Sequence, residues 1–104
     1  MKILIKATNF ELTPALREFV EEKIGQLAKL LSRWDHEGGI EIQVEVGKTT
    51  HHHNKGDVFR AEANLHLPNA MLRAEDTNET IYSAIDKVRD KLKRELERYK
   101  EKNS

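Results

Sequence analysis

The stretch DTNETIYSAIDKVRDKLKRELERYKEK, residues 76–102, decides the fold because it carries the clearest helical pattern in the chain. Asp76 followed three residues later by Glu79 predicts a capping-box start. A helix of about 24 residues would be about 36 Å long, against about 19 Å for the width of a four-stranded sheet, so we expect its last turns to project past the core. Its apolar side chains recur at steps of three and four residues along one face: Ile81, Ile85, Val88, Leu92, Leu96 and Tyr99.

Segments of alternating apolar and polar residues predict a β-sheet that could cover the apolar face of this helix. Apolar and polar residues alternate in residues 2–7, 40–46 and 59–67, which is the period of a strand. Pro68-Asn69 predicts a tight turn, after which residues 71–74 return as a short antiparallel strand.

A second amphipathic helix is predicted after the first strand. Thr13 is a favourable N-cap and Pro14 suits the first helical position. The apolar stripe then continues without interruption to Leu31. The order strand, helix, three strands, helix predicts the α+β class, as a two-layer sandwich with two helices on one face of a four-stranded sheet and a parallel first strand pair. The other sheet face would carry polar side chains: Glu41, Gln43, Glu45, Arg60, Glu62, Asn64 and His66.

The length of 104 residues predicts a single domain spanning residues 1–104, with a basic helical tail at about 95–104. The chain has no cysteine, which excludes a disulfide framework and a thiol nucleophile. It has no nucleophile arrangement around Ser32 or Ser83, no glycine-rich phosphate loop and no long apolar run. We therefore expect a cytoplasmic protein that is not an enzyme, takes no cofactor or small-molecule substrate, and binds no membrane.

Charge is distributed unevenly along the chain. The formal net charge is zero, but residues 87–104 hold eight basic and four acidic residues, which leaves the rest of the chain acidic. This asymmetry favours a polyanionic partner, although a solvated charged helix is the alternative. A helical wheel places Arg98 near the apolar stripe and the acids on the back of the helix: Asp86, Asp90, Glu97 and Glu101. The other cations form two flanks, one of Lys87, Lys91, Arg94 and Lys102, the other of Arg89, Lys93 and Lys100.

The segment KTTHHHNKGD, residues 48–57, is predicted as a polar loop. Three adjacent histidines, His51 to His53, cannot all point at one ion, and no cysteine or suitably spaced carboxylate completes a ligand set, so we expect no metal site. Two alternatives remain, a solvated and partly cationic loop, or a second phosphate-contacting loop together with Lys48 and Lys55.

Nearly the whole chain resembles the ribosome hibernation-promoting factor family, which includes the ribosome-associated inhibitor A proteins. The matching stretches are LTPALREFVEEKIGQLAKLL at residues 12–31 and LRAEDTNETIYSAIDKVRDKLKRELERYKEK at residues 72–102. The resemblance implies a β-α-β-β-β-α fold related in shape to double-stranded RNA-binding domains. It also implies binding to ribosomal RNA in the decoding region of the small ribosomal subunit, where messenger and transfer RNA would sit.

The resemblance carries over to individual cations. Arg17 and Lys23 match basic family positions in the first helix. Lys87 is a candidate from the wheel alone. The matching cations of the last helix are Lys91, Arg94, Arg98, Lys100 and Lys102.

The function expected from the resemblance is therefore a hibernation factor, monomeric when free, that blocks messenger and transfer RNA and inhibits translation. The alternative is a protein-interaction module that uses the charged C-terminal helix without RNA. Length is compatible with the short form of the family or with a truncated long form. The sequence leaves both this choice and the pairing of bound ribosomes open.

Overall fold

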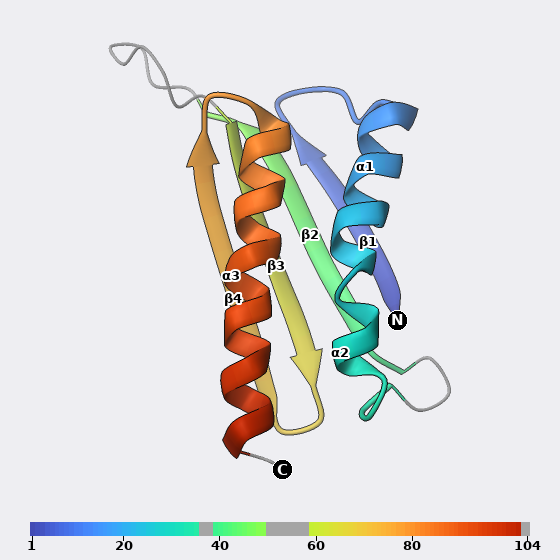
Figure 1. The fold of residues 1–104 in the computed structure, drawn as a ribbon. Coiled ribbons are helices and arrows are strands. Elements are labelled where there is room, and N and C mark those ends of the chain that lie inside the picture. The colour runs from blue at the N-terminus through green and yellow to red at the C-terminus, as the bar shows by residue number, and fades with distance from the viewer. Residues whose placement is uncertain (36–38, 50–58, 103–104) are drawn as a thin grey trace.

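The computed structural model describes residues 1–35, 39–49 and 59–102. One sheet has the strand order β1-β2-β3-β4, and the helices lie on one of its faces (Figure 1). This arrangement confirms the predicted two-layer α+β sandwich. The strands are β1 (Lys2–Thr8), β2 (Glu41–Lys48), β3 (Phe59–Leu67) and β4 (Ala70–Asn78), and the helices are α1 (Pro14–Gly25), α2 (Ala28–Leu31) and α3 (Ile81–Lys102).

The sheet combines one parallel pair with an antiparallel meander, as the sequence predicts. β1 runs parallel to β2, and the β2–β3 and β3–β4 pairs are antiparallel. The register sets Ile42 opposite both Ile3 and Leu65, and Leu65 opposite Leu72, so these residues form one apolar row across the sheet. The alternate residues of each strand point to the uncovered face, which is polar except for Leu4 and Met71.

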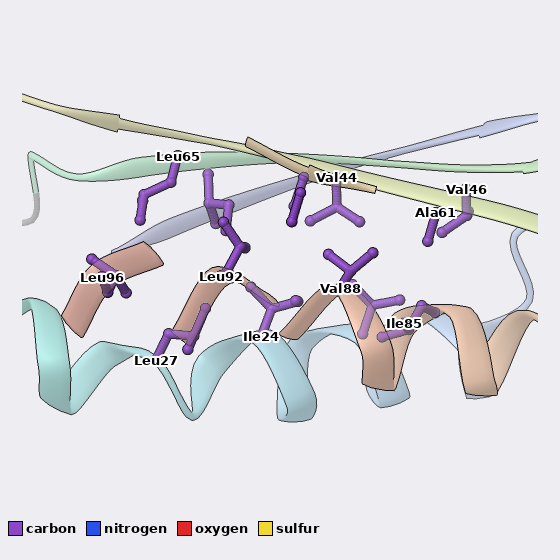
Figure 2. Close-up of a cluster of buried hydrophobic side chains, with 14 of the residues drawn as sticks. Ile24, Leu27, Val44, Val46, Ala61, Leu65, Ile85, Val88, Leu92 and Leu96 are labelled. Atoms are coloured by element: carbon purple, nitrogen blue, oxygen red, sulfur yellow. The ribbon is translucent and has the colours of Figure 1, made fainter. Parts of the chain in front are cut away.

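The core lies between the sheet and the helices (Figure 2). α3 packs on β3 and β4, whereas α1 packs on β1 and against α3. Burial of each large aliphatic side chain contributes about 1.5–3 kcal/mol, so this single layer of contacts supplies most of the stabilisation. Its fully buried members include Ile24, Leu27, Ile42, Leu65, Ile85, Leu92 and Leu96.

The first helix begins as predicted but is interrupted. The Thr13 hydroxyl accepts a hydrogen bond from the backbone N–H of Leu16 at 3.1 Å, and Pro14 occupies the first turn. After Gly25 the chain tightens, because the N–H of Leu27 donates to the carbonyl of Ile24, three residues back, at 3.0 Å. The prediction of one continuous helix to Leu31 is therefore wrong, although its apolar stripe stays buried through α2.

The start of α3 also differs from the prediction. β4 extends to Asn78, so Asp76 is a strand residue and the predicted capping box does not form. The Asp76 carboxylate instead accepts hydrogen bonds from Lys91 of α3 at 3.3 Å and from the Asn78 side chain at 3.2 Å. The helix is capped instead by the Thr80 hydroxyl, which accepts from the N–H of Ser83 at 3.0 Å.

The last turns of α3 stay on the core. α3 runs along the strands rather than across them (Figure 1). Its 22 residues span about 33 Å and the nine residues of β3 span about 30 Å, so the two lengths match. Leu96 and Tyr99 are buried, and the Tyr99 ring packs edge-to-face on Trp34 with centroids 5.1 Å apart. The predicted projection is wrong because it compared the helix with the width of the sheet.

The predicted histidine loop, with His51 to His53 and Lys55, lies outside the described residues. In the part of the chain that the structure describes, no helix combines the length and apolarity required to cross a membrane.

Replacement of the observed cap tests the start of α3. Thr80→Ala removes the side-chain acceptor of the Ser83 N–H and should lower the free energy of unfolding by about 1 kcal/mol. Glu79→Ala is the matched control, since a capping box would require Glu79 and the observed cap does not. Urea unfolding of both variants checks the assignment, and a larger loss in Glu79→Ala would contradict it.

Candidate nucleic-acid interface

The solvent side of α3 is bounded by two grooves, one on each flank. The β4 groove lies between α3 and β4 and contains Lys91, which donates to the carbonyl of Glu75 at 2.7 Å. The predicted flank that holds Lys91 and Arg94 therefore faces β4. The groove is lined by Arg73, Ala74, Glu75, Lys91, Arg94, Glu95 and Arg98.

Arg98 belongs to this first flank, and its predicted place near the apolar stripe is wrong. Its side chain is 69% exposed and pairs with Glu95 at 2.9 Å. At 17 residues beyond Ile81 and about 100° per residue, Arg98 falls beside Lys91 and Arg94 on the wheel. Arg94 forms no ion pair or hydrogen bond within the described residues and is therefore available to a phosphate.

The interhelical groove lies on the other flank, between α3 and the α1–α2 turn. Arg89 spans it, donating to the Gln26 side chain at 2.8 Å and pairing with Asp90 at 2.9 Å. Lys29 and Lys93 stand on its two sides. The full lining is Gln26, Leu27, Lys29, Leu30, Arg89, Asp90 and Lys93.

An aromatic cluster continues this groove toward the start of α3. The rings of Phe19 and Tyr82 meet edge-to-face with centroids 4.7 Å apart, and Lys23 lies 5.5 Å from the Phe19 ring centroid. Lys23 also pairs with Asp86 at 3.6 Å. Asp86 therefore faces α1 rather than the back of α3, because α1 supplies a cation at this position.

The remaining predicted cations are spread more widely. Arg17 pairs with Glu21 at 3.9 Å on its own helix. The side-chain contacts to α3 from this part of the chain are made by Phe19, Lys23 and the C-cap residue Gln26, and none of them brings Arg17 to the α3 cations. Lys87 lies on the exposed ridge of α3 with Lys93 and Arg94. Lys100 and Lys102 lie in the last turn of the same helix.

The structure adds two cations that sequence reasoning did not select. Arg73 lines the β4 groove and Lys29 lines the interhelical groove. Each comes from a different element than α3, so a wheel of α3 alone could not find them. The sequence feature that could have identified Arg73 is its position on the outward face of the last strand, which lies at the sheet edge next to the helix.

The uncovered sheet face is charged but balanced. Glu45, Glu62 and Glu75 lie opposite one another on three strands, and Arg60 pairs with both Glu62, at 2.8 Å, and Glu75. Arg73 adds a contact to Glu62 at 3.2 Å. This face satisfies its own charges and lacks the excess of cations found on α3, so it is poorly suited to a polyanion.

Hydrogen bonds hold Glu62 in its ionised form. Asn64 donates to Glu62 at 3.0 Å, and this bond together with Arg60 and Arg73 lowers the pKa of Glu62 below its ordinary 4.5. The carboxylate hydrogen bond also raises the pKa of Arg60. Among the described residues, no three histidine, aspartate or glutamate side chains gather as metal ligands.

The sequence of the chain matches a known family. The family model described as Sigma 54 modulation protein / S30EA ribosomal protein matches residues 3–104. The chain therefore belongs to this family.

Curated relatives bear names that refer to the ribosome. A ribosome hibernation promotion factor of Lactococcus lactis is 37% identical over 100 residues, which cover 96% of this chain and 50% of the relative. A ribosome hibernation promoting factor of Escherichia coli is 34% identical over 102 residues, which cover 98% of this chain and 96% of the relative. The chain thus spans about half the length of some relatives and nearly the whole length of others.

Solved structures show the same fold. The crystal structure of the Thermus thermophilus Protein Y N-terminal domain has a TM-score of 0.72 and 29% identity, covering 95% of this chain and 99% of that one. A ribosomal subunit interface protein from Coxiella burnetii has a TM-score of 0.71 and 25% identity, covering 96% of this chain and 98% of that one.

Titration tests the charge network of the sheet face. Glu62→Gln should lower the free energy of unfolding by about 1 kcal/mol at neutral pH, because it removes a largely buried partner of Arg60 and Arg73. A lowered pKa means that the stabilisation is present above the ordinary value of 4.5 and is lost as the pH falls through the folded-state pKa. Urea unfolding across this range should show the two proteins converging in acid. A difference in the free energy of unfolding between the two proteins that does not change with pH would contradict the assignment.

Proposed function

We propose that the chain is a ribosome hibernation factor that binds ribosomal RNA in the decoding region of the small ribosomal subunit. It blocks the path of messenger and transfer RNA and so inhibits translation. The mechanism is occupancy, and the protein performs no reaction. Residues 1–104 act as one ribosome-binding unit in the cytoplasm, monomeric when free.

One observation carries this proposal above all. α3 buries its apolar stripe along its full length and yet leaves cations exposed on both flanks, so the helix is firmly held while its charge faces outward. Five of these cations have no ion pair or hydrogen bond to other described residues, and a phosphate meets them without breaking an existing contact: Lys87, Lys93, Arg94, Lys100 and Lys102.

Family membership and electrostatics together favour RNA as the partner. The names of the relatives refer to ribosome hibernation, and a structural relative is named for the ribosomal subunit interface. Lysine and arginine side chains that neutralise phosphates release condensed counterions, which provides affinity without base recognition. The folded two-layer body then supplies the bulk that obstructs the RNA path.

The alternative is docking of the charged α3 surface on a ribosomal or other protein. It is favoured by the acids that alternate with the cations, such as Asp90 beside Arg89 and Glu95 beside Arg98. Co-sedimentation with ribosomes before and after nuclease digestion of accessible RNA separates the two functions. Loss of binding after digestion supports RNA recognition, and retained binding supports a protein partner.

Removal of three cations from the β4 groove should weaken ribosome binding without unfolding the domain. The variant is Lys91→Gln, Arg94→Gln, Arg98→Gln, and we expect the magnitude of the log–log salt slope to fall by about two to three. Lys2→Gln, Lys6→Gln, Arg33→Gln is the matched control, because it removes three exposed cations that line neither groove. Pelleting across a salt series checks this, and equal losses in both variants would point to general charge rather than to this surface.

Occupancy predicts competition. Excess initiator transfer RNA with messenger should displace the protein from small subunits, because both require the same space, and inhibition should reverse when the protein is washed away. Filter binding of labelled transfer RNA at increasing protein concentration measures this effect. Simultaneous binding of both ligands without loss of affinity would contradict the mechanism.

A further inference from the structure

The two grooves beside α3 differ in one respect that bears on what each can bind. Both grooves are lined by cations and, among the described residues, neither lining includes an aromatic side chain, but the Phe19–Tyr82 pair lies between α1 and α3, on the interhelical flank toward the start of α3. Tyr82 is 45% exposed, and the other exposed large apolar side chains of the described chain, Leu4 and Met71, belong to β1 and β4. Tyr82 thus exposes an aromatic ring on the helical face that also carries the excess cations.

The ring of Tyr82 is held in place. Its edge-to-face contact with Phe19 anchors it to α1, and aromatic pairs of this kind contribute about 0.5–1.5 kcal/mol beyond their area. Lys23 covers the Phe19 ring and pairs with Asp86, one turn along α3 from Tyr82. A ring fixed on one side and open on the other is a preorganised stacking surface, because little side-chain entropy is lost when a ligand binds.

Cations follow Tyr82 along the same side of α3. Arg89 and Lys93 lie two and three turns further on, opposite Gln26 and Lys29. Tyr82 and Lys93 are 11 residues apart, or about 16 Å along the helix. A stacked strand rises about 3.4 Å per nucleotide, so this distance accommodates about four or five nucleotides.

We propose that the interhelical groove binds a single-stranded RNA segment, with one unpaired base stacked on Tyr82 and the following phosphates on Arg89, Lys93 and Lys29. The proposal rests on the proposed function and names the form of RNA that this flank takes. Aromatic side chains stack only on bases that are not already stacked within a helix, and proteins contact duplex RNA mainly through its phosphates and 2′-hydroxyls. An exposed aromatic ring in line with cations therefore fits a single strand better than a duplex.

Three substitutions separate stacking from charge. Tyr82→Leu keeps apolar packing on Phe19 but loses the π face, Tyr82→Phe keeps the ring, and Lys93→Gln removes one phosphate contact. Met71→Ala is the matched control, because it removes an exposed apolar side chain from the opposite face of the sheet. Each full-length variant is measured by ribosome pelleting and by photocrosslinking to a short single-stranded RNA containing 4-thiouridine, with thermal unfolding as the check on folding.

We expect Tyr82→Leu to weaken binding about 5- to 100-fold. The factor should be the same at every salt concentration, because stacking releases no counterions. Lys93→Gln should reduce the magnitude of the salt slope by about 0.7, the value for one phosphate of a single strand. Tyr82→Phe and Met71→Ala should bind as the parent protein does. The crosslinked residue in the parent protein should be Tyr82.

Two results would overturn the inference. In the first, Tyr82→Leu binds both ribosomes and the oligonucleotide as tightly as the parent protein does. This result would leave the proposed function intact. The other is an equal loss in Tyr82→Phe, which would assign the effect to the hydroxyl rather than to the ring. Failure of the parent protein to pellet with ribosomes would instead refute the proposed function, and the oligonucleotide crosslink would then report on the groove alone.

Discussion

Burial of the apolar stripe of α3 along the whole length of β3 and β4 is the constraint on which the rest of the structure depends. Because Leu92 and Leu96 must face the sheet, the rotation of the helix about its axis is fixed. Lys91, Arg94 and Arg98 are then turned toward β4, and Arg89 and Lys93 toward the α1–α2 turn. The charged surface is therefore a geometric consequence of the core, and a substitution that rotated α3 would disperse both grooves at once.

Periodicity was sufficient to predict the layers, because burial on one face imposes a period of two on a strand and of about 3.6 on a helix. Both patterns are long in this chain, and the parallel first pair follows from the helix that connects the first two strands. The N-cap at Thr13 was also predictable, since the hydroxyl acts within its own turn. Lys91 and Arg94 were assigned to one flank of α3 and Arg89 and Lys93 to the other, as the structure has them, because a helical wheel needs only local geometry. Arg98 was misplaced near the apolar stripe, although the same wheel puts it beside Lys91 and Arg94.

Contacts between distant segments escaped prediction. Asp76 resembles a cap residue locally, but pairing with β3 and the contact from Lys91, 15 residues away, keep it in a strand. Tyr99 stays in the core because the ring of Trp34, which follows α2, packs on it. Asp86 turns to α1 for its cation, and Arg73 reaches the β4 groove from a different element. In each case the deciding partner lies far away in the chain.

The placement of α1 has a consequence for the dynamics of the domain. β3, β4 and α3 follow one another in the chain and pack together, whereas β1 pairs with β2 alone and its Ile3 and Ile5 are only partly buried. Sub-global opening should therefore detach β1 with α1 while the rest of the sheet and α3 remain assembled. The interhelical groove does not survive that opening, but the β4 groove does. A ligand held between the helices thus opposes the opening and slows amide hydrogen exchange in β1, a strand that it does not touch.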